Sequence, residues 1–255
     1  MLLLLSPAKI QNNTPQNLVN EFTQPEFLNS AESLVDEIRQ LSTMELSRLL
    51  SINAGLAQLN ADRYFNWQRP FTAENSKQAV LSFNGEVFHG LDANSFSPND
   101  FEYLQSHLRI LSGLYGILRP LDLMQPYRLD ISTKLQIGKW KNLYSFWGDS
   151  LTLSVNEALA HLGDNRVLLN LASGEYFKSI NRQLLEARVI DFEFLENKNE
   201  GYRSVVMYTK KARGMMARYV IQNRIENVED LKGFDAEGYW INPQLSGENK
   251  LVFTR

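Results

Sequence analysis

The stretch that decides the fold is Met1–Lys9, MLLLLSPAK, in which an unbroken apolar run gives way at once to polar residues. A short, wholly apolar run is typical of a strand that is buried on both faces, as in a parallel sheet covered by helices. Ser6 and Lys9 then come just after the end of this strand. Ligands of α/β sheets bind beyond the carboxyl ends of strands, so both residues are candidates for a functional site.

Other short apolar runs also predict strands, and longer periodic segments predict helices. We expect strands over Ala79–Phe83, Val167–Leu171, Val189–Phe194 and Val205–Tyr208. We expect helices over Ser30–Leu41, Thr43–Phe65, Asp100–Leu111, Ser150–Leu162 and Lys211–Ile225, with helix starts at Thr43 and at Ser97-Pro98-Asn99-Asp100. Strands and helices are interspersed, and neither a linker nor a repeat interrupts residues 1–255. The sequence therefore predicts a single compact domain of mixed α/β class.

Composition excludes several classes of protein and site. With 44% hydrophobic residues the chain has enough apolar material for a core, which excludes a mainly disordered protein. The absence of cysteine excludes disulfides, thiolate zinc sites, iron–sulfur clusters and cysteine nucleophiles. The only histidines, His89, His107 and His161, lie far apart in the sequence, so we expect no metal site and no cofactor. The apolar N-terminal run is too short for a signal peptide, and no segment could span a membrane, which predicts a cytoplasmic protein.

The formal net charge of −3 argues against a nucleic-acid partner, but the charge is unevenly distributed. One window, 201–225, contains no Asp or Glu and carries +6, from Arg203, Lys210, Lys211, Arg213, Arg218 and Arg224. A second window, 107–148, sets Arg109, Arg119, Arg128, Lys134, Lys139 and Lys141 against Asp122 and Asp130 alone. The chain therefore has two electropositive segments within an acidic remainder.

The cations of the first segment fall on two sides of a predicted helix. At about 100° per residue, Lys210, Arg213 and Arg224 group on one side, and Lys211 and Arg218 form a second pair. Apolar residues such as Met216 and Val220 occupy the arc that is expected to face the core. Such a helix could line a cleft for a polyphosphate backbone, although an ordinary solvated helix is the alternative interpretation.

The segment Leu108–Tyr127, LRILSGLYGILRPLDLMQPY, is open to two interpretations. Gly113 and Gly116 flank apolar residues between two predicted helical stretches, as in a helix-hairpin-helix element whose backbone N–H groups approach a phosphate. The alternative is a helix that ends at Gly113 and is followed by a tight turn. The aromatic segment Tyr144–Asp149 also has two interpretations: its rings could stack on bases, or they could pack in the core. Core packing is favoured more strongly for Phe146 than for Trp147.

More polar residues follow the predicted strand at 167–171. Asn170, Ser173, Glu175 and Lys178 could converge with Ser6, Lys9 and Asp149 in one pocket, with a carboxylate as acid or base. The alternative is that Ser173 caps a short helix and Glu175 complements its dipole. We leave both interpretations open.

Together these motifs resemble the YaaA family of bacterial proteins, also called the DUF328 family. The matching stretches span essentially the whole chain: Ser6–Lys9, Phe83–Gly85, Leu111–Asp130, Leu143–Asp149 (LYSFWGD), Asn170–Ser179 (NLASGEYFKS), Lys210–Arg218 (KKARGMMAR), Phe234–Tyr239 and Leu251–Arg255. The resemblance implies a cytoplasmic peroxide-stress protein that limits free iron and so protects DNA. It also implies a mixed α/β "cantaloupe" fold that binds duplex or branched DNA through a positively charged cleft with a helix-hairpin-helix element.

Two functions follow from the sequence. The first is a non-enzymatic DNA-binding protein that contacts phosphates with little sequence specificity. Its expected DNA-binding residues are Arg109, Gly113, Gly116, Arg119, Arg128, Lys210, Lys211, Arg213 and Arg218. The resemblance implies Lys9 and Lys178 as further cleft residues and Leu111–Pro120 as the hairpin element. The second is an enzyme acting on a nucleobase or nucleotide in a pocket formed by Ser6, Asp149, Asn170, Ser173 and Glu175. Direct iron chelation fits neither the absence of cysteine nor the scattered histidines.

Overall fold

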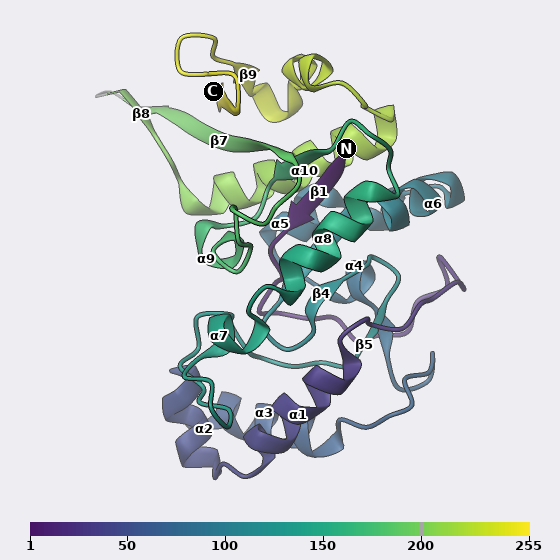
Figure 1. The fold of residues 1–255 in the computed structure, drawn as a ribbon, viewed down its shortest axis with the longest axis vertical. Coiled ribbons are helices and arrows are strands. Elements are labelled where there is room, and N and C mark those ends of the chain that lie inside the picture. The colour runs from purple at the N-terminus through teal and green to yellow at the C-terminus, as the bar shows by residue number, and fades with distance from the viewer. Residues whose placement is uncertain (199–200) are drawn as a thin grey trace.

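The computed structural model describes residues 1–198 and 201–255. Its main sheet has the strand order β4-β3-β1-β6-β7-β10-β9, with β8 paired to β7. Figure 1 shows β7 and β8 next to each other at the upper left. Strand β1 is parallel to β3 and β6, β6 is parallel to β7, and β7 is parallel to β10, whereas β4 and β9 are antiparallel to their neighbours. The strands span Leu2–Leu5 (β1), Leu108–Ser112 (β3), Gly116–Leu118 (β4), Val167–Asn170 (β6), Arg188–Lys198 (β7), Gly201–Arg203 (β8), Trp240–Ile241 (β9) and Lys250–Thr254 (β10).

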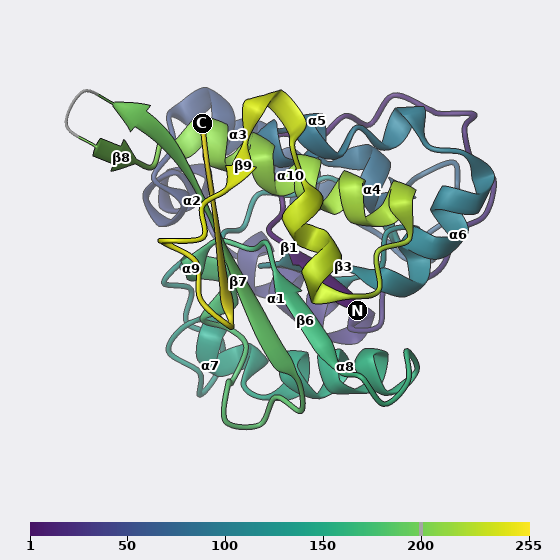
Figure 2. The ribbon, with the colours of Figure 1, turned by 90° about the horizontal axis from the view of Figure 1, so that it is seen from above.

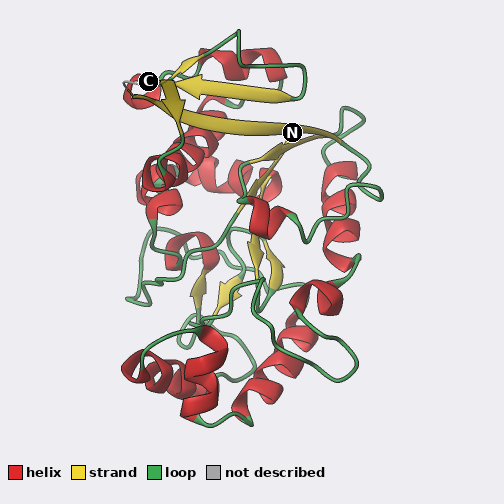
Figure 3. Cartoon of the chain, turned by 90° about the vertical axis from the view of Figure 1, so that its left-hand side faces the viewer, coloured by secondary structure: helices red, strands yellow, loops and turns green. Residues whose placement is uncertain are grey.

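Helices cover this sheet (Figure 3). They span Leu28–Arg39 (α1), Thr43–Leu50 (α2), Ala54–Asn66 (α3), Ala79–Ser82 (α4), Glu86–Leu91 (α5), Pro98–His107 (α6), Leu143–Trp147 (α7), Ser150–Ala160 (α8), Gly174–Phe177 (α9) and Val206–Asn223 (α10). Short 3-10 turns lie at Ala93–Ser95, Val228–Gly233 and Ala236–Gly238, and a small second sheet pairs β2 (Lys77–Gln78) with β5 (Leu123–Met124). The mixed α/β class predicted from the sequence is confirmed.

The N-terminal apolar run forms a buried strand, as predicted, and the structure places it between β3 and β6. Leu2, Leu3, Leu4 and Leu5 are fully buried, because β1 has a neighbour on each side and helices over both faces. The predicted strands at 167–171 and 189–194 are also present, as β6 and β7. Figure 2 shows β7 as the long strand that crosses the molecule, with β8 at its outer end.

Two of the predicted strands are wrong. Ala79–Phe83 begins with the helical turn α4, and Val205–Tyr208 enters the first turn of α10. A buried turn of helix and a buried strand can have the same short apolar sequence, so periodicity could not separate them at Ala79. In the second run Val206 and Met207 are 69% and 57% exposed, so these apolar side chains are not core residues at all.

Two predicted helices are divided or shortened. The stretch Thr43–Phe65 forms α2 and α3, which are separated at Ser51, where φ is 52°. Helix α6 ends at His107 rather than Leu111, because Leu108–Ser112 pairs with β1 in the sheet. The predicted starts are confirmed: Ser42 caps α2 at Thr43, and Ser97 caps α6 at Pro98, each in a capping box.

Helix α10 packs against α5 with almost no space between the two backbones. A Cβ atom added to Gly214 would lie 1.8 Å from the carbonyl oxygen of Val87, and one added to Gly90 would lie 2.1 Å from that of Lys211. Only glycine permits such an approach. Met216 and Val220 of α10 are fully buried, as the sequence predicts for this arc of the helix.

Candidate functional site

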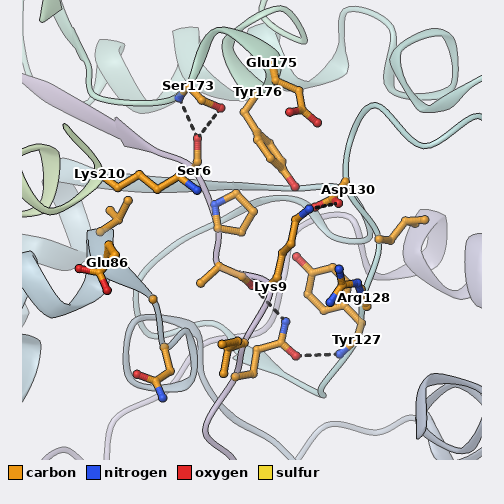
Figure 4. Close-up of a pocket in the computed structure, with 18 of the residues that line it drawn as sticks. Ser6, Lys9, Glu86, Tyr127, Arg128, Asp130, Ser173, Glu175, Tyr176 and Lys210 are labelled. Atoms are coloured by element: carbon orange, nitrogen blue, oxygen red, sulfur yellow. Dashed lines mark hydrogen bonds and ion pairs between the residues drawn. The ribbon is translucent and has the colours of Figure 1, made fainter. Parts of the chain in front are cut away.

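A cavity of about 360 Å³ opens beyond the carboxyl ends of β1 and β6. We call it the strand-end cavity. Five separate segments line it: residues 6–11 after β1, 84–87 at the start of α5, 127–130, Ser173 to Tyr176 around the start of α9, and Lys210 with Arg213 on α10. Figure 4 shows Lys9, Glu175 and Lys210 entering from three different sides. The position agrees with the rule that ligands of α/β folds bind at strand carboxyl ends.

Ser6, which follows β1, forms hydrogen bonds with Ser173, which follows β6, at the wall of the cavity. The backbone N–H of Ser173 donates to Ser6 Oγ at 2.8 Å, and Ser6 Oγ donates to the hydroxyl of Ser173 at 3.2 Å (Figure 4). Ser173 stands at the N-cap position of α9, but its side chain makes no capping hydrogen bond. Of the two interpretations of Ser173, the structure therefore supports the one in which its hydroxyl faces the cavity.

The strand-end cavity unites the two electropositive segments of the sequence. Arg128 comes from the window 107–148, and Lys210 and Arg213 come from the window 201–225, while Lys9 follows β1. Lys9 Nζ lies 2.9 Å from the carboxylate of Asp130. Arg128, Lys210 and Arg213 form no ion pair with any residue that the structure describes. Three cations at this site are therefore left without a counter-ion from the described part of the chain.

Arg213 is the most constrained of these three cations. Its Nε is buried and has no hydrogen-bond partner among the described residues, and desolvation lowers the pKa of the guanidinium. A buried charged donor without a partner is costly, and bidentate contacts with a phosphate or carboxylate would satisfy it. The side chain is thus suited to an anion that enters the cavity.

Carboxylates also line the strand-end cavity. Glu175 lies in the first turn of α9, accepts a hydrogen bond from the Ser132 hydroxyl, and faces the cavity opposite Lys9 (Figure 4). Glu86 and Asp130 line the same space. The cavity is consequently a site of mixed charge rather than a uniformly positive surface. Among the described residues, no group of three or more His, Asp or Glu side chains is placed to hold a metal ion.

Several predicted site residues lie outside this cavity. Asp149 accepts a hydrogen bond from the Asn181 amide at 3.0 Å, and the Asn170 amide donates to Asp191 at 2.7 Å. The Lys178 ammonium lies 5.1 Å from the centre of the Tyr144 ring. The structure therefore brings Ser6, Ser173 and Glu175 together but not Asp149 or Asn170.

Two other cations of α10, and Arg224 directly after its end, are neutralised by carboxylates that are distant in sequence. Lys211 pairs with Glu237, Arg218 pairs with Asp92 at 3.0 Å, and Arg224 pairs with Asp100 at 2.9 Å. The window 201–225 has no carboxylate in its sequence, but carboxylates from other segments lie beside its cations in the folded protein. The helical grouping was correct for Lys210 with Arg213 and for Lys211 with Arg218. It failed for Arg224, which turns to α6.

Arg109 and Arg119 form hydrogen bonds and an ion pair with other residues of the protein. Arg109 donates to the carbonyl oxygens of Gln105 and Leu108, and burial lowers its pKa to about 10. Arg119 pairs at 3.0 Å with Asp122, which is 1% exposed. Both arginines thus have protein partners in the positions where the sequence suggested phosphate.

The helix-hairpin-helix interpretation of Leu111–Pro120 is wrong. The segment is an antiparallel β-hairpin in which Ser112 of β3 pairs with Gly116 of β4. Both glycines are buried: a Cβ on Gly113 would lie 2.1 Å from the carbonyl oxygen of Leu129, and Gly116 has φ +71° and abuts Trp147. The glycines therefore permit close packing, and their N–H groups do not reach the surface. Trp147, 3% exposed, is a core residue whose indole N–H donates to the Gly113 carbonyl.

Sequence reasoning missed Glu86, Asp130, Tyr127 and Tyr176 as lining residues. All four lie in or directly after the motifs of the family: Glu86 follows Phe83–Gly85, Tyr127 and Asp130 lie within Leu111–Asp130, and Tyr176 lies within Asn170–Ser179. Tyr127 and Tyr176 have buried rings, and burial raises the pKa of both phenols. Nothing in their spacing distinguishes them from ordinary core aromatics.

Comparison with known families agrees with the motifs. The model of the family described as peroxide stress protein YaaA matches residues 1–245. Among the described residues, no helix has both the length and the apolar character needed to cross a membrane. The match covers nearly all of the 255 residues, from β1 through the whole strand-end cavity to the segment before β10. The chain belongs to the YaaA family of peroxide stress proteins.

Proposed function

We propose that this peroxide stress protein binds DNA, using the strand-end cavity and its rim to contact phosphates. The observation that carries the proposal is the convergence of Arg128, Lys210 and Arg213, from two separate basic segments, on one cavity. Lys210 and Arg213 have no counter-ion among the described residues, so a phosphate would supply the missing partner. Limitation of iron-driven damage would then follow from occupation of the DNA rather than from chelation.

The acidic remainder of the chain fits this proposal. Outside the window 201–225 the residues sum to a net negative charge, and the remaining α10 cations are paired. Negative charge over the rest of the surface would repel a polyanion and restrict DNA to the face that bears the cavity. Such binding has little sequence specificity, because it depends on the backbone and not on the base edges.

The test measures the affinity of a short fluorescent duplex by anisotropy across a range of salt concentrations. Affinity should fall steeply with salt, and the slope of log K against log salt should decrease by about 0.9 for each phosphate contact removed. We expect Lys210→Ala and Arg213→Ala each to weaken binding and flatten this slope. Lys211→Ala is the matched control, because Lys211 is the adjacent residue and pairs with Glu237.

Two results would contradict the proposal. The first is a duplex affinity that hardly depends on salt. The second is an equal loss of affinity in Lys211→Ala and Lys210→Ala, which would mean that only the overall charge matters. Circular dichroism and thermal unfolding of each variant separate a lost contact from a lost fold.

A second candidate is an enzyme that acts on a nucleobase or nucleotide. The observation in its favour is that Glu175 and Lys9 line one cavity, so a carboxylate and an ammonium are available for proton transfer. Incubation with deoxynucleotides and with duplexes containing oxidised bases, followed by mass spectrometry, would reveal turnover. Glu175→Gln should then abolish it, whereas Asp149→Asn, a carboxylate outside the cavity, should not. If no substrate is converted, this candidate is excluded for those substrates.

A further inference from the structure

The strand-end cavity has a shape and lining that simple phosphate contact does not require. A backbone phosphate needs only cations at a surface, whereas this site is a recess of about 360 Å³. That volume falls in the range of about 300–1,000 Å³ that is typical of small-molecule sites. The recess therefore has room for a chemical group beyond the phosphate.

The lining differs from one side of the recess to the other. Lys210 and Arg213 of α10 supply positive charge at one side. Apolar side chains and buried rings form much of the remaining wall: Pro7, Ala8, Val87, Leu129, Tyr127 and Tyr176. Aromatic and apolar walls are suited to a flat heterocycle, since every base has a π-face that can stack.

Hydrogen-bond acceptors complete the recess. Asp130 and Glu175 carry carboxylates into it near Lys9 (Figure 4). The exocyclic amino groups of adenine, cytosine and guanine are donors, and a carboxylate accepts from them. A purely anionic ligand would instead be repelled by these two groups, so the combination favours a ligand with an anionic end and a neutral, donor-bearing end.

We propose that the strand-end cavity binds a single nucleotide, with its phosphate on Lys210 and Arg213 and its base between the apolar walls, facing Asp130 and Glu175. The inference deepens the DNA-binding function proposed above and rests on it. A nucleotide reaches such a recess from DNA only after it has left the duplex stack, as at a bulge or a mispaired site. A free deoxynucleoside monophosphate has the same chemistry, so the experiment distinguishes the two sources.

The first arm measures binding of free ligands to the full chain by calorimetry. The probes are a deoxynucleoside 5′-monophosphate, the corresponding deoxynucleoside, and inorganic phosphate. The monophosphate should bind at least about fivefold more tightly than inorganic phosphate, which is the lower limit for the stacking of one base on aromatic side chains. Arg213→Ala should abolish this binding, and Lys211→Ala should retain it. Equal affinity for the monophosphate and for inorganic phosphate would overturn the inference, because the cavity would then be an anion site only.

The second arm uses DNA and a ratio of affinities. A duplex with a single-nucleotide 2-aminopurine bulge is compared with the same duplex fully paired, by anisotropy and by 2-aminopurine fluorescence. The bulged duplex should bind at least about fivefold more tightly, which is the lower limit for one stacked base. Ala8→Phe, which fills the recess, should bring the ratio to near one. If Ala8→Phe fails to fold, Glu175→Gln, at an exposed position, should reduce the same ratio.

The outcomes separate this inference from the proposed function. If paired and bulged duplexes bind the wild-type chain equally well and no monophosphate binds, the inference is wrong and DNA binding stands. If the monophosphate binds and no duplex does, DNA binding is wrong and the cavity is a site for free nucleotides. If neither a duplex nor the monophosphate binds, both proposals are wrong.

Discussion

Lys9 Nζ and the carboxylate of Asp130 lie 2.9 Å apart, and the pair joins the loop after β1 to the segment that follows β5. The two side chains are 59% and 28% exposed, so water screens the pair and its direct contribution to stability is small. Its larger effect is on the strand-end cavity, where Asp130 offsets part of the positive charge of Lys9, Arg128, Lys210 and Arg213.

Removal of this carboxylate should strengthen DNA binding. In Asp130→Asn the ammonium of Lys9 loses its partner and the cavity gains one positive charge. We expect affinity for a duplex to rise by roughly threefold to tenfold at low salt, with a smaller gain at high salt. Asp164→Asn is the matched control, because it changes the net charge equally at an exposed position before the amino end of β6. The same gain in both variants would show that the effect is not local to the cavity.

The close crossing of α5 and α10 should not tolerate a side chain. Gly214→Ala would place a methyl group 1.8 Å from the Val87 carbonyl oxygen, so α10 must shift away and carry Lys210 and Arg213 with it. We expect a loss of stability of about 1–3 kcal/mol, together with weaker DNA binding. Gly174→Ala, which has nothing within 4 Å of the added Cβ, should change stability little. Urea unfolding measures both, and an unchanged midpoint for Gly214→Ala would contradict the packing described here.

Arg119 and Arg128 should have opposite roles, although they lie close in the sequence. Arg119→Ala leaves the buried Asp122 without its ion-pair partner and should cost about 1–3 kcal/mol of unfolding free energy. Arg128→Ala, at the strand-end cavity, should instead weaken DNA binding. Unfolding and anisotropy measured on both variants provide the check. Equal effects of the two substitutions on DNA affinity would contradict the separation.

The imidazole of His107 should make the protein less stable at mildly acidic pH. The ring is half-buried, stacks on Tyr103 at 3.7 Å, and donates from Nδ1 to the Tyr103 carbonyl oxygen at 2.9 Å. Desolvation lowers its pKa below the ordinary value of 6.5, so the unfolded chain binds this proton more readily than the folded chain. Stability should therefore fall as the pH decreases from about 6.5 through the folded pKa.

The measurement is the denaturant midpoint of unfolding between neutral and mildly acidic pH. His107→Gln removes this ring and should lose less stability over that range than the wild type. His161→Gln is the matched control, since Nδ1 of the exposed His161 also bonds to the carbonyl oxygen four residues earlier. If the denaturant midpoint of His107→Gln changes with pH as that of the wild type does, other groups set the pH dependence.

The sequence by itself determined the class of fold and the strand end that Ser6 and Lys9 follow. Leu2–Leu5 is apolar throughout, which is typical of a strand with both faces covered, and this predicted that Ser6 and Lys9 follow a strand carboxyl end. The sequence around Thr43 and at Ser97–Asp100 predicted two helix starts, because capping acts within one turn. Apolar patterning and helix capping depend on neighbouring residues in the chain, so they can be recognised without the tertiary structure.

Only the tertiary structure decided what the glycines and the cations do. The local sequence around Gly113 and Gly116 is compatible with two structures: a turn that approaches a phosphate, and a β-hairpin that packs against Leu129 and Trp147. The structure has the β-hairpin. Likewise, Lys211 and Lys210 are adjacent, yet Glu237 neutralises the first and the second faces the cavity. Pairing of strands and pairing of charges both depend on partners that are distant in the chain. Which strands and which charges pair depends on the segments that the fold brings within a few ångströms of one another. The local sequence does not contain this information.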